Sequence, residues 1–158
     1  MEPEPEPDAM EIPSRVTVKL IAGKSLPAED WDTGKSDPYV EMRILSGSDA
    51  HKPVKSEKHT STTRPETLDP VWEPNETFQL MDNMAATDSS WVRLKVWDKD
   101  HLAADDFIGM ADLPLAEVRA ASGHTLKTEL PLVDHKNRPV AGKDGRASLE
   151  VEVRAFII

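Results

Sequence analysis

Two acidic clusters contain the residues whose types and spacing could do chemistry. The first lies in VWDKDHLAADDFIG, residues 96–109, where a strand-like run ends and four aspartates follow within nine residues: Asp98, Asp100, Asp105 and Asp106. The second lies in LPAEDWDTGKSDPYV, residues 26–40, and contains Glu29, Asp30, Asp32 and Asp37. Because like charges repel, a folded protein that gathers these carboxylates either points them apart into water or holds a cation among them.

Oxygen-rich loops of this kind suit a hard cation with flexible coordination. Calcium takes six to eight oxygen ligands from carboxylates, carbonyls and water. The chain has no cysteine and its five histidines are scattered, so the ligand set favours calcium over zinc or copper. Turn formation alone also accounts for any single one of these aspartates. An EF-hand loop starting at Asp98 is excluded, since Ala103 and Gly109 stand where that loop requires Gly and Glu.

The elements that must position these loops are short strands. Eight runs of alternating apolar or β-branched residues predict strands at 16–21, 39–44, 58–63, 76–80, 91–97, 107–111, 126–133 and 147–156. Clusters of Pro, Gly, Asp and Ser separate them, which is typical of a β-sandwich. We expect a helical turn at 115–122 and a long loop at 46–57. Alternation buries one face of each sheet, so the acidic loops belong at an end of the sandwich.

Composition limits the function classes. The length of 158 residues is typical of one domain, and the formal net charge is −10. Residues 1–13 alternate Glu and Pro and are expected to form a disordered acidic tail before a domain at 14–158. The negative charge argues against nucleic acid as a partner. It also argues against binding to an anionic membrane unless a cation is bound.

Sequence signals for targeting point to a cytoplasmic location. No apolar run approaches the ~18 residues that a membrane span needs. The amino-terminal residues have neither the basic nor the apolar region of a signal peptide. The absence of cysteine is compatible with a reducing compartment.

Three motifs in one order resemble a known family. SDPYV at 36–40, TLDPVWEPNETF at 67–78 and VWDKDHLAADDFIG at 96–109 look like those of a C2 domain, across roughly residues 14–156. The resemblance implies an eight-stranded antiparallel Greek-key β-sandwich. Three loops at one end would bind two or three calcium ions and dock on phospholipid headgroups. A strand-like run closes the chain and none precedes Val16, which favours the phospholipase-C-like strand order, known as type II topology.

The resemblance also implies a ligand set. In the motifs, Asp37 and the third-loop residues Asp98, Asp100 and Asp106 match the family's calcium ligands, and the carbonyl of Lys99 commonly serves as well. Asp105 is an extra acid, either a solvated neighbour or an outer ligand. The first loop departs from the family pattern, because Trp31 stands where an aspartate is usual. Asp30 is the favoured ligand there, and Asp32 is its substitute.

Several other residues have expected roles. Trp31 and Leu102 lie near the tips of the first and third loops, and we expect both to insert shallowly into lipid. The alternative for Trp31 is that it packs back onto the sandwich. Trp72 and Trp97 are expected to be structural. The family's second site, a basic patch for phosphoinositides, is expected to be weak, because Glu41 stands where such members carry Lys.

Together these features predict a non-catalytic module that binds anionic phospholipid membranes when calcium is present. Recruitment to the membrane surface would follow a rise in calcium. The chain shows no Ser-His-Asp order, no cysteine nucleophile and no phosphate-cradling Gly loop, so we expect no enzyme activity and no small-molecule substrate. Two alternatives stay open: a calcium-independent scaffold for protein partners, and the regulatory domain of a larger lipid-signalling enzyme.

Overall fold

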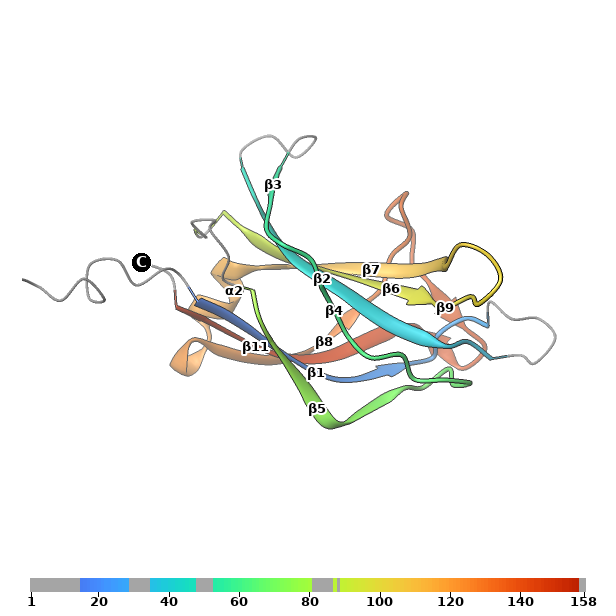
Figure 1. Cartoon of the computed structure of the whole chain (residues 1–158). Helices are drawn as coiled ribbons and strands as arrows, with labels where there is room; N and C mark the ends of the chain where they lie inside the picture. The colour runs from blue at the N-terminus through green and yellow to red at the C-terminus, as the bar shows by residue number, and fades with distance from the viewer. Residues whose placement is uncertain (1–14, 29–34, 48–52, 81–86, 88, 157–158) are drawn as a thin grey trace, which may run out of the picture.

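Two antiparallel sheets pack face to face in a sandwich (Figure 1). The structure is a computed structural model, and it describes residues 15–28, 35–47, 53–80, 87 and 89–156. The first sheet has the order β5-β1-β11-β8, and the second has the order β3-β2-β6-β7, with β4 also paired to β2. Since β3 and β4 share one edge of β2, each sheet has four strand positions, and the predicted eight-stranded antiparallel sandwich is confirmed.

The strands of the first sheet are β1 (Arg15–Lys24), β5 (Val71–Gln79), β8 (Thr125–Pro131) and β11 (Ser148–Phe156). Those of the second sheet are β2 (Pro38–Ser46), β3 (Val54–Lys55), β4 (His59–Thr60), β6 (Trp91–Asp98) and β7 (Asp106–Pro114). A short hairpin joins β9 (Ala141–Gly142) and β10 (Gly145–Arg146). The helix α2 (Leu115–Ala120) and the 3-10 turn η1 (Ser122–His124) confirm the helical turn predicted at 115–122.

The core follows from the alternation of each strand. Val16, Val18 and Leu20 of β1 are fully buried, while the residues between them are half-exposed. The same alternation runs along β6, where Val92, Leu94 and Val96 face inward, and along β11. Burial of this kind contributes about 1.5–3 kcal/mol for each large apolar side chain. The first and last strands lie side by side, with Arg15 opposite Phe156, as the predicted strand order requires.

Three segments differ from the sequence-based expectation. β5 begins at Val71 rather than at residue 76, because the exposed stretch that contains Pro74 interrupts the alternation. As an edge strand, β5 tolerates a proline that a central strand would not. The expected loop at 46–57 contains the two residues of β3, so that prediction was wrong there. The β9–β10 hairpin has too few residues to show alternation, and the sequence did not predict it.

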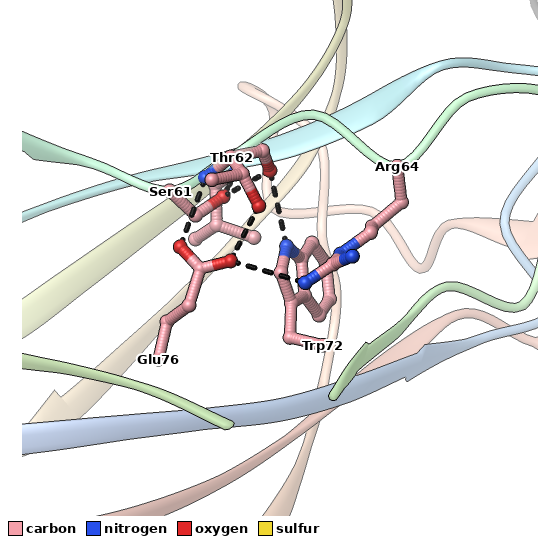
Figure 2. A network of polar contacts seen from close by, with 6 residues as sticks. Ser61, Thr62, Arg64, Trp72 and Glu76 are labelled. Atoms are coloured by element: carbon pink, nitrogen blue, oxygen red, sulfur yellow. Dashed lines mark hydrogen bonds and ion pairs between the residues drawn. The ribbon is translucent and has the colours of Figure 1, made fainter. Parts of the chain in front are cut away.

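A polar network closes one side of the sandwich (Figure 2). Trp72 is fully buried, and its indole Nε1 donates to the carbonyl oxygen of Thr62 at 3.0 Å. Glu76 accepts hydrogen bonds from the backbone N–H and the hydroxyl of Thr62 and from Arg64. Ser61 joins the network by accepting from the backbone N–H of Val40 at 2.8 Å. The edge of the second sheet is thereby tied to β5 of the first, and the structural role predicted for Trp72 is confirmed.

Within the described part of the chain, no helix is both long and apolar enough to cross a lipid bilayer.

Candidate functional site: the acidic end of the sandwich

The register of the second sheet gathers three of the predicted ligands. Asp37 directly precedes β2, Asp98 ends β6 and Asp106 begins β7. The Cα of Asp98 pairs with that of Asp106, and on its other side with that of Pro38. Directly opposed residues of antiparallel strands have Cα atoms about 4.5–5.5 Å apart. Sheet pairing therefore holds these backbones side by side, and we call residues 36–39 and 98–106 the acidic end.

Asp98 is the buried member of the acidic end. The residue is only 6% exposed, and its Oδ1 accepts the backbone N–H of Asp37 at 2.7 Å. The backbone N–H of Lys99 donates in return to the carbonyl oxygen of Asp37 at 2.9 Å. A buried carboxylate is tolerated only when hydrogen bonds or charges compensate it. This exchange fixes the position of Asp98 relative to Asp37.

A second hydrogen bond holds the side chain of Asp37. Its Oδ1 accepts the backbone N–H of Glu66 at 2.6 Å. The segment around Glu66 is itself held to the start of β2, because Arg64 donates to the carbonyl of Pro38 and Thr67 to that of Ser36. The second oxygen of Asp37 accepts no hydrogen bond from a described residue. One oxygen thus fixes the side chain, and among the described residues no donor competes with a cation for the other.

Asp100 and Asp106 also have carboxylate oxygens to which no described residue donates a hydrogen bond. The Oδ1 of Asp100 accepts the backbone N–H groups of Leu102 and Ala103 at 2.8 and 3.2 Å, as aspartates in turns commonly do. Its other oxygen has no hydrogen-bond donor in the described ranges. Asp106 is exposed, and its carboxylate accepts no hydrogen bond from any residue that the structure describes. The oxygen-only donor set of these side chains fits a hard cation such as calcium.

Asp105 differs from its neighbours because both of its oxygens are occupied. Oδ1 accepts the backbone N–H of Asp100 at 2.9 Å, and Oδ2 accepts the hydroxyl of Tyr39. The Lys99 ammonium lies 3.8 Å from Oδ2. The hydrogen bond from Asp100 N–H, followed by that from Tyr39, holds the pKa of Asp105 below its ordinary value. Burial, and then the bond to Asp105, raises the pKa of Tyr39 well above its ordinary value.

The remaining predicted site residues divide into described and undescribed ones. Leu102 is 98% exposed on the connection between β6 and β7, where an inserting residue would need to be. Asp30, Trp31 and Asp32 lie outside the described residues. Among the residues that are described, no three carboxylates or imidazoles converge closely enough to hold a metal ion by themselves. The described carboxylates of the acidic end therefore do not form a complete metal site without further ligands.

Sequence reasoning missed an aromatic cluster beside the acidic end, and it did not name Arg93 and Lys95 in the basic patch that it expected to be weak. His135 stacks on Phe107, with ring centroids 3.9 Å apart, and Phe107 meets Trp97 edge-on at 5.4 Å. The outer face of the second sheet also carries a groove of about 250 Å³, lined by Glu41, Arg43, Leu45, Lys55, Arg93 and Lys95. The signal for the groove was available, because Arg93 and Lys95 alternate with the buried residues of β6.

Carboxylates offset part of the charge in and around that groove. Lys58 lies 3.8 Å from Glu41, and Arg93 pairs with Asp112 at 2.8 Å.

Comparisons with known proteins place this geometry in a family. A family model described as the C2 domain matches residues 14–132. The human multiple C2 and transmembrane domain-containing protein 1 is 32% identical over 115 residues, which are 73% of this chain and 10% of that protein. Tricalbin-1 of Saccharomyces cerevisiae is 31% identical over 130 residues, which are 82% of this chain and 10% of that protein. The chain therefore spans about a tenth of the length of these curated relatives.

Solved structures agree on the fold. A C2 domain of plant extended synaptotagmin 1 superposes with a TM-score of 0.64 at 22% identity, covering 92% of this chain and 95% of that one. The calcium-bound pair of C2 domains of extended synaptotagmin 2 gives a TM-score of 0.57 at 19% identity, covering 91% of this chain and 42% of that one. With three motifs, a matching sandwich and a family model over most of its length, the chain belongs to the C2 domain family.

Proposed function

We propose that this C2 domain is a non-catalytic, calcium-dependent phospholipid-binding module. The observation that supports the proposal is the acidic end, where sheet register holds the backbones of Asp37, Asp98 and Asp106 side by side. Oxygens of Asp37, Asp100 and Asp106 accept no hydrogen bond from the described residues, so they suit a cation. The calcium-bound C2 domains of extended synaptotagmin 2, a structural relative, support the choice of ion.

The residues act by holding negative charge together until a cation neutralises it. Asp37, Asp98, Asp100 and Asp106 would hold calcium, with Lys99 offering its carbonyl oxygen and Asp30 or Asp32 completing the set from the first loop. Bound calcium supplies positive charge and open coordination positions that phosphate oxygens of anionic lipids can fill. Because the sheet holds the backbones of Asp37, Asp98 and Asp106 in place beforehand, the change would be mainly electrostatic and would need no large movement of the sheet.

Calcium and lipid binding would be thermodynamically coupled. If lipid tightens calcium binding by some factor, calcium must tighten lipid binding by the same factor. A domain with a net negative charge would stay off an anionic membrane at low calcium and bind it when calcium rises. This coupling would move the protein from the cytoplasm to the membrane surface, as a peripheral protein, on a calcium signal.

Apolar insertion would add to this electrostatic contact. Leu102 is 98% exposed, and it follows Asp100 by two residues. Burial of a leucine side chain is worth about 1.5–3 kcal/mol when complete, so a shallow insertion contributes part of that. Trp31 of the first loop is proposed for the same role.

The test is calcium titration calorimetry with and without phosphatidylserine vesicles. Wild type should bind calcium saturably, and vesicles should tighten that binding. Asp100→Asn should weaken it, since the substitution removes one carboxylate and leaves a hydrogen-bond acceptor for Leu102 and Ala103. Glu117→Gln is the matched control, because this exposed acid lies in α2 at the opposite end of β7.

Two outcomes would contradict the proposal. The first is wild-type protein that gives no calcium heat and does not associate with vesicles. The second is an effect of Asp100→Asn no larger than that of Glu117→Gln. Either result would favour the alternative function, a calcium-independent scaffold that binds protein partners.

A further inference from the structure

The connection between β6 and β7 is attached to β2 through one side chain. Asp105 accepts the hydroxyl of Tyr39 on one oxygen and the backbone N–H of Asp100 on the other. Tyr39 belongs to β2, whereas Asp100 belongs to the connection. The Lys99 ammonium, 3.8 Å away, adds a weaker attraction. Asp105 thus joins the middle of the acidic end to a strand that precedes it by 66 residues.

The two adjacent aspartates of the motif therefore have different chemistry. Asp106 accepts no hydrogen bond from a described residue, so both of its oxygens can turn to a cation. Each oxygen of Asp105 already accepts one donor, so only its remaining lone pair is open to a cation. Hydrogen bonds to a charged acceptor are about twice as strong as neutral ones, so a cation that drew Asp105 away from Tyr39 or Asp100 would break strong contacts.

The hydrogen bond from the backbone N–H of Asp100 to Asp105 restricts the position of Asp100. Residues 99–105 are free of strand pairing, and a loop that orders only when the ion binds loses conformational entropy at that step. A group ordered beforehand avoids this loss and binds more tightly. Because Asp105 holds the backbone N–H of Asp100, it fixes the residue that carries the predicted ligand oxygen.

We propose that Asp105 and Tyr39 form a latch that positions Asp100 for the cation, and that Asp105 contributes no oxygen to the ion itself. The role of the latch rests on the proposed function, but its existence in the calcium-free protein does not. Asp105 is a positioning residue in this proposal, and Tyr39 is its partner. The latch also gives a role to Asp105, the acidic residue that the family's calcium-ligand pattern does not include.

The first experiment is a double-mutant cycle on calcium affinity. Tyr39→Phe removes only a hydroxyl, and Asp105→Asn keeps the size of the side chain but removes its charge. For a latch, each variant should weaken calcium binding about 3- to 10-fold, in line with the ordinary net contribution of one lost hydrogen bond. The double variant should be no weaker than the worse single one, since both break the same contact.

A direct ligand role for Asp105 gives a different pattern. Asp105→Asn would then weaken calcium binding far more than Tyr39→Phe, and the two effects would add. Such additive behaviour would overturn the proposal. Thermal melts in a chelator provide the check that all three variants are folded.

The second experiment needs no calcium. Tyr39 is the only tyrosine in the chain, so biosynthetic labelling with 3-fluorotyrosine gives a single ¹⁹F resonance. In a chelator, Asp105→Asn should shift this resonance, whereas Glu117→Gln should leave it unchanged. An unchanged resonance in Asp105→Asn would overturn the latch. A shifted resonance together with no calcium binding by wild type would keep the latch and refute the proposed function instead.

Discussion

Replacement of Trp72 by Phe tests how the side of the sandwich is closed. Trp72 is fully buried and donates to Thr62 at 3.0 Å. Phe has on the order of 50 Å² less surface than Trp, so the lost burial is about 1.3 kcal/mol at 25 cal/mol per Å². The lost hydrogen bond adds about 1 kcal/mol. The expected loss in the free energy of unfolding is therefore about 2–3 kcal/mol.

Trp97→Phe is the matched control. Trp97 is half-buried, and its Nε1 has no hydrogen-bond partner among the described residues. The substitution removes no hydrogen bond and keeps an aromatic ring against Phe107. Its expected effect is below about 1 kcal/mol, since it removes an unsatisfied donor as well as some surface.

Thermal denaturation in a chelator measures both variants. For a domain of this size, 1 kcal/mol corresponds to about 2–4 °C in Tm. Trp72→Phe should therefore lower Tm by about 5–10 °C, and Trp97→Phe should lower it by less than about 4 °C. Equal shifts, or a larger shift for Trp97→Phe, would refute the view that the network around Trp72 ties the two sheets together.

Three further predictions concern other parts of the molecule. Gly142→Ala places a Cβ against the carbonyl oxygen of Ser25, closer than van der Waals contact allows. We therefore expect the free energy of unfolding, measured in urea, to fall by about 1–3 kcal/mol. An unchanged urea midpoint would contradict that contact. Leu102→Ser should weaken vesicle binding in a sedimentation assay without a change in Tm, because this side chain is 98% exposed; retained binding would exclude insertion. The pKa of Asp134 is lowered, first by the backbone N–H of Arg138. Its contribution to stability is therefore present above the unfolded pKa of about 4 and is lost as the pH falls through the folded value. The Tm difference between wild type and Asp134→Asn should shrink below about pH 4, and a difference that grows there would reverse the assigned sign.

Much of the fold could be predicted from the sequence because inward and outward positions alternate along most of each central strand. β1, β2, β6 and β11 each show that alternation, and each lies where it was expected, within a few residues. β5 could not be delimited, because the interruption around Pro74 is a property of an edge strand and not of local alternation. The β9–β10 hairpin was not predictable for a related reason, as two-residue strands carry no period.

The site was partly predictable for a different reason. The two motifs at 36–40 and 96–109 predicted that Asp37, Asp98 and Asp106 lie in one place, and the sheet register brings their backbones together. The roles of Asp30 and Asp32 stay predictions, because both residues lie outside the described ranges. What the motif could not supply was the different role of Asp105, since its partner Tyr39 is 66 residues away and no local spacing encodes that hydrogen bond.

The pairing of the first strand with the last also determines how the domain would respond to tension. Arg15 lies opposite Phe156, at the far end of β1 from the connection to the acidic end. A pull on the two ends would act across the hydrogen bonds between β1 and β11 and would load them one after another, starting at that pair. Strands opened in sequence give way at lower force than strands sheared all at once. A domain held at its acidic end by a membrane and pulled through both ends would therefore open first at its opposite end.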